Sequence, residues 1–514
     1  MRFSRKTKIV TAVIAVICAS AVLFVPSGAL FGGADTPARQ LEEHSVVTSS
    51  VVDAKQTVEG GDQVSSDEFI SAEQDPDKVN GELGKDSDPG RIDFSEIPDL
   101  KEKAPYVAPE QSEYADSHYR VTGFKEFDLD GLFPENFIGD TSWDPMGIDD
   151  NGIIYFGYTG RRSDLVAGEE VEDFAVFSYN PETDVVKLLG TFIEACRAAN
   201  NYQYGEAIPK GHTKFYCIDG KMYMASQSFH DFKDGIEGLE NYRGSHLFMY
   251  DIEKETLVDL SATMPGGVWT EHQGVVSMNY MPEIGKLVGF THPYADLVFY
   301  DLATGTIDRY VQGIPWTRGN PLSRELIVSG DKVYLYRGTE ETGYGINGGA
   351  NFYCPVYCYD YGEDRLYQTG DKINGGFWNG QATTSDGKTT YISGCCSYLF
   401  KLDHETGKIT FLRDMDADGE DSLGFTYSIS MSPDETKLFY IPTAHNPGYI
   451  YEYDIATNGV TKIANVANCV YCGSNIVSNN WYYFTRFGDN GSWERFPTLV
   501  AFRLERWDGD YTIK

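Results

Sequence analysis

The chain of 514 residues is short of basic side chains. It has 42 lysines and arginines against 77 aspartates and glutamates, a formal net charge of −35. Such a protein repels phosphates, so we expect no nucleic-acid partner. Helical periodicity is nearly absent, which argues against a helical fold. Beyond Val25 no apolar run is long enough to span a bilayer, so we expect membrane contact only through the N-terminus.

The N-terminus has the order of segments found in secretory signals. Four basic residues among the first eight precede an uncharged run from Ile9 to Val25, and small residues follow. We expect residues 1–29 to be a signal peptide that is cleaved on export; the alternative is an uncleaved membrane anchor. Either interpretation predicts a secreted, periplasmic or cell-surface protein.

The segment from 30 to 117 is rich in Asp, Glu, Ser and Pro. Residues 35–116 contain 21 acidic and 7 basic residues, and so 14 of the 35 net negative charges. Because the segment has few large apolar side chains to bury, we expect a disordered acidic linker. Residues 118–514 are rich in Tyr, Phe and Gly and are expected to form the folded domain.

A two-strand phrase recurs through this domain, for example "LFMYDIEKETLVDLS" at Leu247 and "IYEYDIATNGVTKIA" at Ile450. Each copy consists of an alternating strand, an acidic residue or Asn, a polar turn and a second strand. The aligned positions of the seven copies are Asn180, Asp251, Asp301, Asp360, Asp403, Asp454 and Glu505. Another hairpin precedes most copies, so each repeat contains four strands.

Four antiparallel strands repeated about seven times predict an all-β fold, a seven-bladed β-propeller. The early stretch "YRVTGFKEFDL" is expected to close the ring by joining the last blade. The domain, about three quarters of the chain, resembles secreted seven-bladed propellers of the YVTN and WD40-like kind. That resemblance concerns architecture, and function has to come from a site.

One blade begins with "GHTKFYCIDGKMYMASQSFHD", in which Asp219-Gly220 predicts a tight turn. Pairing Ile218 with Lys221 places His212 opposite Gln227, with His230 three residues beyond. In a propeller the start of the inner strand and the end of the second strand open on the same face. Both imidazoles are therefore expected at one mouth of the ring.

Counting residues outward from the other hairpin turns places further cationic and aromatic side chains at this mouth. In the fourth blade, Arg324 is expected opposite Arg337. The predicted set, besides His212 and His230, is Arg161, Arg162, Lys214, Arg243, His246, His272, His292, Tyr294, Arg324, Arg337, Tyr427, His445 and Arg486. The alternative is a polar rim, in which basic residues such as Arg162 pair with local acids such as Asp164.

A basic mouth suits an anionic polysaccharide or oligosaccharide, because Arg and His bind uronate carboxylates and aromatic rings stack on sugars. The predicted substrate-binding residues are Lys214, Arg243, His246, Arg324, Arg337, His445 and Arg486. Cleavage by β-elimination needs a group that neutralises the carboxylate, a base and an acid. The predicted catalytic residues are His212, His230, His272, His292 and Tyr294.

This arrangement resembles the propeller-fold uronate lyases, namely ulvan lyases and, more distantly, oligogalacturonate lyases. In ulvan lyases an inner-strand His and a second His about twenty residues on face a Tyr and an Arg of the next blade. His212 and His230 match the first pair, whereas His272 and His292 stand where Tyr and Arg are expected. The resemblance implies a lyase, expected to be a monomer; the alternative is a non-catalytic module that binds a protein or a glycan.

Metal ligation is a further option. The four histidines His212, His230, His272 and His292 could bind one metal ion if they converged. The stretch "DMDADGED" places Asp414, Asp416 and Asp418 as in the first half of a calcium loop, although Phe425 stands where the closing Glu belongs, so a solvated acidic turn is the alternative.

Eight cysteines follow the signal segment, and in an exported protein we expect them to form disulfides. The stretches "NCVYC" and "GCC" leave zinc as the alternative.

Overall fold

The computed structural model describes residues 117–227, 242–292, 294–312, 323–336, 353–374, 378–394, 398–415, 426, 429–441, 449–465, 471–486 and 497–506. Of residues 353–354, 372–374, 378–379, 449, 465, 471–474 and 486 it describes the backbone alone. The predicted signal peptide, and the predicted linker up to residue 116, lie outside this part of the chain. No helix in the ranges described has the length and apolar character needed to cross a membrane.

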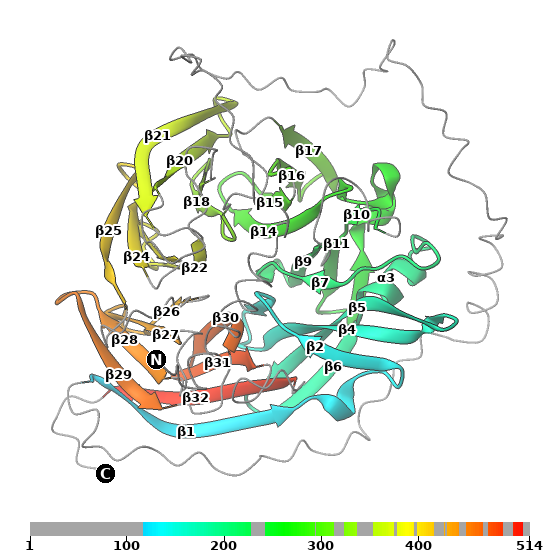
Figure 1. The fold of residues 1–514 in the computed structure, drawn as a ribbon, viewed down its shortest axis with the longest axis horizontal. Helices are drawn as coiled ribbons and strands as arrows, with labels where there is room; N and C mark the ends of the chain where they lie inside the picture. Colours follow the sequence, from blue (N-terminus) through cyan, green and yellow to red (C-terminus); the bar gives the residue numbers. More distant parts are fainter. Residues whose placement is uncertain are drawn as a thin grey trace, which may run out of the picture.

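Seven antiparallel sheets stand around a common centre and form a β-propeller (Figure 1). Blade one contains β2 (Phe137–Thr141), β3 (Met146–Ile148), β4 (Ile154–Val166), β5 (Glu169–Asn180) and β6 (Val185–Thr191). Blade two contains β7 (Lys210–Gly211), β8 (Tyr216–Ile218), β9 (Lys221–Gln227), β11 (Leu247–Asp251) and β12 (Thr256–Asp259). Blade three contains β14 (Gly274–Met281), β15 (Lys286–His292), β16 (Leu297–Asp301) and β17 (Thr306–Val311).

The other four blades repeat this order. Blade four contains β18 (Ile327–Ser329), β19 (Lys332–Tyr336), β20 (Tyr353–Asp360) and β21 (Arg365–Asn374). Blade five contains β22 (Trp378–Thr383), β23 (Thr389–Gly394), β24 (Tyr398–Asp403) and β25 (Lys408–Asp414). Blade six contains β26 (Ile429–Met431), β27 (Lys437–Tyr440), β28 (Tyr449–Asp454) and β29 (Gly459–Asn465). Blade seven contains β30 (Tyr471–Ser478), β31 (Trp481–Arg486), β32 (Thr498–Arg506) and the early strand β1 (Tyr119–Asp128).

Short elements lie between the blades. They are α3 (Phe192–Ala198), the 3-10 turns η4 (Asp130–Leu132), η5 (Leu260–Thr263) and η6 (Pro265–Gly267), and a two-stranded pair of β10 (Gly244–Ser245) with β13 (Thr270–Glu271). Of these, α3 follows blade one and packs against β12 of blade two.

The ring closes as predicted. Strand β1 pairs antiparallel with β32 from Tyr119 opposite Arg506 to Asp128 opposite Thr498. The outermost strand of the last blade therefore comes from the start of the domain, and the long β1 runs beside β32 in Figure 1. This arrangement covers the β32 edge that blade seven would otherwise leave open.

The recurring Asp of the repeat has a structural reason. In blade three, Asp301 ends β16, and its Oδ1 accepts hydrogen bonds of 2.9 Å from the backbone N–H groups of Ala303 and Thr304. Its Oδ2 lies 2.5 Å from Nζ of Lys286, the residue opposite in β15. The same Lys–Asp pairing recurs in blades four and six, at 3.6 and 2.8 Å. One side chain thus holds both the turn and the strand pair.

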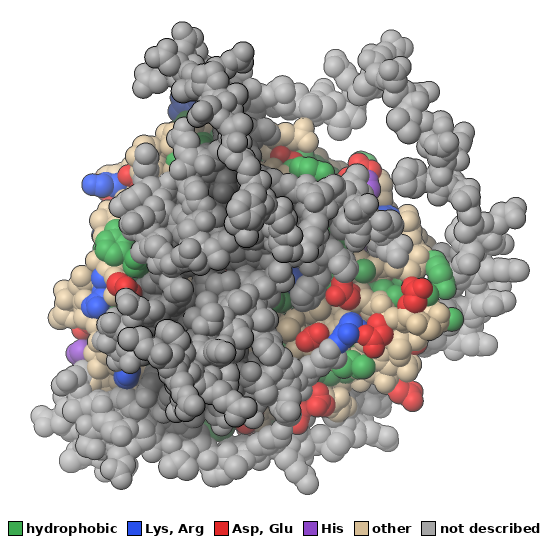
Figure 2. Space-filling model, viewed as in Figure 1, with side chains coloured by type: hydrophobic (Ala, Val, Ile, Leu, Met, Phe, Trp, Pro, Cys, Tyr) green, Lys and Arg blue, Asp and Glu red, His purple; other side chains and the backbone are tan. Residues whose placement is uncertain are grey.

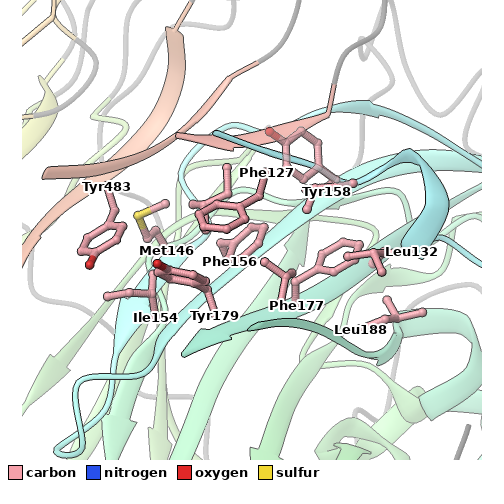
Figure 3. Packing of buried hydrophobic residues seen from close by; sticks show 14 of the residues in the cluster. Phe127, Leu132, Met146, Ile154, Phe156, Tyr158, Phe177, Tyr179, Leu188 and Tyr483 are labelled. Atoms are coloured by element: carbon pink, nitrogen blue, oxygen red, sulfur yellow. The ribbon is translucent and has the colours of Figure 1, made fainter. Parts of the chain in front are cut away.

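Apolar and aromatic side chains fill the spaces between adjacent blades. Figure 3 shows one such layer, in which Phe156, Phe177 and Tyr179 of blade one pack against Phe127 and against Tyr483 of blade seven. Alternating strand patterns produce these layers, because every second residue of a blade faces the neighbouring blade. The stacked blades hold the inner strands in fixed positions.

The inner strands of blades one, two, three, five and seven contain register irregularities. In blade two, the stretch between Gly211 and Tyr216 has two more residues than the part of β9 that it faces. The predicted pairing of Ile218 with Lys221 is confirmed, but His212 does not lie opposite Gln227; Lys210 does. Such bulges redirect side chains, here at the centre of the ring.

Candidate functional site

Contacts between blades that are not neighbours identify the centre of the ring as the candidate site. Arg324 of blade four contacts His212 of blade two, and both contact Asp144 of blade one. Blade three stands between blades two and four along the ring, so these side chains meet toward its axis. We call Trp143, Asp144, Lys210, His212 and Arg324 the axial cluster.

Bulged inner strands supply this cluster. Asp144 lies in the break between β2 and β3, and His212 lies in the break between β7 and β8. In blade three, the register shifts between Val275 and Ser277, and the carbonyl of Val276 accepts a hydrogen bond of 2.8 Å from His212 Nδ1. Each irregularity frees a backbone or side-chain group from the regular ladder.

Hydrogen-bond chemistry fixes the tautomer of His212. Because the Val276 carbonyl only accepts, Nδ1 carries the proton; because the Arg324 guanidinium only donates, Nε2 accepts from its NH2 at 2.5 Å. Asp144 Oδ2 lies 3.3 Å from His212 Nδ1 and 3.4 Å from Arg324 NH2. Both ring nitrogens of His212 are therefore engaged.

An aromatic ring and a second layer of polar groups support these contacts. The Trp143 ring stacks on His212 with centroids 6.1 Å apart, and Lys210 Nζ lies 4.2 Å from the centroid of Trp143. Beside them, Lys214 Nζ lies 3.2 Å from Glu325 Oε1, and the amide of Gln381 in blade five donates to Glu325 Oε2 at 2.7 Å. The polar contacts at the centre thus involve five blades.

Burial controls the protonation of the cluster. His212 is 3% exposed, and burial together with the positive charges of Lys210 and Arg324 holds its pKa well below the usual range, so the imidazole is neutral at pH 7. Burial raises the pKa of Asp144 to about 7, although Arg324 opposes the shift. The 3.3 Å contact between His212 Nδ1 and Asp144 Oδ2 is therefore not an ion pair.

The predicted mouth residues separate into groups. His212, Lys214 and Arg324 come together at the centre, whereas Arg243 and His246 contact Glu206 in a second buried cluster between blades one and two. These two side chains have no described contact with the axial cluster.

The remaining described candidates lie at strand ends. His272 is exposed, has a φ of 52° and donates its backbone N–H to the carbonyl of Arg243 at 2.7 Å. His292 ends β15 opposite Gly274, and Tyr294 is 55% exposed. The structure does not bring these three side chains into contact with His212.

Several predicted residues cannot be placed. His230, Arg337, Tyr427, His445, Asp416 and Asp418 lie outside the described residues, as does the side chain of Arg486. Asp414 ends β25 with an exposed side chain. The predicted alternative of a local ion pair is confirmed for Arg162, whose NH2 lies 2.6 Å from Asp164 Oδ2.

No family model matches this chain. No curated protein matches it either. Among solved structures, a chain in the "Crystal Structure of Mitotic Checkpoint Complex" aligns with 79% of this chain and 98% of its own length, at 10% identity and a TM-score of 0.44. The propeller assignment therefore rests on the strand pairing of the structure itself, and the resemblance to uronate lyases gains no support from these comparisons.

Sequence reasoning missed most of the acidic and aromatic partners at the centre. Trp143 and Asp144 follow a short strand in "TSWDPMG", and Glu325 is adjacent to Arg324. The sequence did place a basic residue, Lys210, two residues before His212. Only the bulges, however, bring these residues together.

The disulfide prediction is wrong for the cysteines whose side chains are described. Cys196, Cys217 and Cys358 are free thiols. The others past the signal segment, Cys354, Cys395, Cys396, Cys469 and Cys472, lie outside the described side chains.

Proposed function

We propose that the protein is an exported propeller that binds an acidic, uronate-containing glycan at the axial cluster. The observation that supports it best concerns the Arg324 guanidinium. Its NH2 group donates to Nε2 of His212, in another blade, at 2.5 Å, and this contact fixes its position. Arginine recognises carboxylates through a planar fork of donors, and fixing its position in advance lowers the ordering cost of binding. Export is supported by the basic, apolar and small segments at the N-terminus.

Protonation of Asp144 would allow Arg324 to exchange this carboxyl for a carboxylate of the ligand. A ligand carboxylate that approaches Arg324 also approaches Asp144, and two nearby carboxylates cannot both remain ionised at low cost. Because the pKa of Asp144 is already about 7, it takes up a proton and yields Arg324 to the ligand. Binding is then tighter below pH 7 than above it.

The geometry favours a binding module over a lyase. A general base needs a lone pair that can reach the substrate proton, and the Nε2 lone pair of His212 accepts from Arg324. In this arrangement His212 positions the guanidinium. Elimination would require Arg324 to move away from the imidazole.

The experiment measures binding of the exported chain to polygalacturonate, alginate and ulvan, with dextran as the neutral control. Arg324→Gln is expected to weaken binding about 10- to 100-fold, since a charge-assisted hydrogen bond is lost. Arg365→Gln, which alters a half-exposed arginine on the outer strand β21, is the matched control and should bind as the parent does.

Failure of the folded parent to bind any of the three polymers would refute the proposal. Equal affinity of Arg324→Gln and the parent for the polymer would show that the glycan binds at another site. Ultraviolet absorbance from unsaturated uronate, formed by the parent and abolished in His212→Ala, would instead establish a lyase.

A further inference from the structure

We infer that Cys196, His246 and Asp259 form a zinc-binding site between blades one and two, separate from the axial cluster and independent of the proposed function. Cys196 lies on α3, His246 directly precedes β11, and Asp259 ends β12. All three side chains are buried. Sulfur, imidazole nitrogen and carboxylate oxygen are together a donor set that suits zinc.

The local fold places the three ligands. Phe192 of α3 stacks on Phe248 of β11 with ring centroids 3.9 Å apart, which fixes the helix over the strand. Thr191 caps the start of the helix, because its hydroxyl accepts a hydrogen bond from the backbone N–H of Glu194. Cys196, one turn after Phe192, thereby faces His246.

Two of the distances between the ligand atoms match those of a tetrahedral zinc centre. Cys196 Sγ lies 3.5 Å from His246 Nδ1, which lies 3.2 Å from Asp259 Oδ2, and all three atoms lie within 4.8 Å of one another. Tetrahedral zinc with usual bond lengths separates sulfur from nitrogen by about 3.5 Å and nitrogen from oxygen by about 3.3 Å. The three ligands leave one coordination position for a water molecule.

Outer groups already orient the ligands as zinc sites require. His246 Nε2 lies 3.3 Å from Glu206 Oε1, so the ring can donate to a carboxylate while Nδ1 binds the metal. Arg243 in turn donates to both oxygens of Glu206 at 2.9 Å. Asn201 Nδ2 donates to Asp259 Oδ2 at 2.7 Å.

The charges around the ligands also permit the metal. Without it, His246 lies between the carboxylates of Glu206 and Asp259, and Arg243 pairs with Glu206. Zinc binding requires the thiolate of Cys196 and a lone pair on His246 Nδ1, so it would release protons as it brings a divalent cation to these carboxylates.

The first test measures metal content of the full chain after zinc loading and removal of excess metal. The parent is expected to retain one more equivalent of zinc than Cys196→Ser. Cys358→Ser, which alters a buried cysteine of blade four, is the matched control and should retain the parental amount. Glu206→Gln should bind zinc about 10- to 100-fold more weakly, because it loses the outer carboxylate.

Cobalt substitution gives a readout that does not depend on the stability of a variant. Co(II) bound to the parent should show a thiolate charge-transfer band and intense visible bands typical of a tetrahedral site, and Cys196→Ser should lack the charge-transfer contribution of this thiolate. A folded parent without a cobalt–thiolate band, or a Cys196→Ser protein with the parental zinc content, would overturn the inference and leave the cluster as a metal-free ionic network.

Discussion

Asp144 shows how one buried carboxyl sets the electrostatics of a site. Its side chain contacts His212 and Arg324, yet burial outweighs the guanidinium and raises its pKa from 3.8 to about 7. Across that interval the folded protein binds more protons than the unfolded chain. The stability from the protonated carboxyl is therefore fully present below pH 3.8 and is lost as the pH rises through about 7.

Replacing this carboxyl should remove that pH dependence. Asp144→Asn, which keeps the shape, should match the parent near pH 4 and exceed its free energy of unfolding above pH 7. A pKa change from 3.8 to about 7 corresponds to at most about 4 kcal/mol. Urea unfolding of both proteins across this range measures the difference. A difference that is constant with pH would contradict the assignment.

The composition of the site was only partly predictable. Turn positions placed His212, Lys214 and Arg324 at one mouth; His212 and Arg324 do meet, and Lys214 pairs with Glu325, the neighbour of Arg324. The contact between His212 Nε2 and Arg324 could not be predicted, because two additional residues after Gly211 change the register on which the prediction relied. Side chains such as Asp144 are recognised as partners only when blades one and four are placed across the same axis.

The blade was better predicted than the site, because its pattern is local. Alternating residues and turn chemistry gave the strands, and Asp219 and Gly220 have φ values of 50° and 71°, as their hairpin turn requires. The contacts of the recurring Asp are also local, because its turn and its Lys partner lie on neighbouring strands of one blade. Bulges have no comparable signal in a single sequence.

The recurring Asp should be a stability determinant. Asp301→Ala removes two hydrogen bonds to the turn and the ion pair with Lys286, so it should lower the free energy of unfolding by about 1–3 kcal/mol. Asp301→Asn retains an acceptor for the turn and should lose less. Glu405→Ala, at an exposed turn position of blade five, should stay within about 0.5 kcal/mol of the parent. Equal losses for Asp301→Ala and Glu405→Ala in chemical denaturation would refute this role.

The described surface over blades one and two is acidic, whereas basic side chains lie at the centre of the ring. Figure 2 shows several carboxylates and fewer basic side chains on the described surface over blades one and two. Lys210 and Arg324, by contrast, are 6% and 8% exposed and lie against Trp143 at the centre. An acidic surface disfavours the non-specific binding of anions, so the anion recognition that we propose would be confined to the place where the blades converge.

Closure of the ring depends on one strand near the start of the domain. Strand β1 contributes the buried side chains of Tyr119, Val121 and Phe127 and pairs with β32 along its length. Without it, β32 becomes an open edge and the layers beside blade seven lose apolar contacts. This long-range pairing couples the last blade to the start of the domain.

Two shortened chains test this coupling. A chain that begins at Ser117 retains β1 and should unfold at the same temperature as the full chain, as expected if the acidic segment is a linker. A chain that begins at Leu129 lacks β1 and should lose its cooperative thermal transition or unfold at a clearly lower temperature, with aggregation through the exposed β32 edge. Circular dichroism melting and size-exclusion chromatography measure both effects. If the chain from Leu129 had the same melting temperature as the chain from Ser117, closure by β1 would not stabilise the ring. The remaining blades alone would then maintain the contacts between blades one and four at the axis.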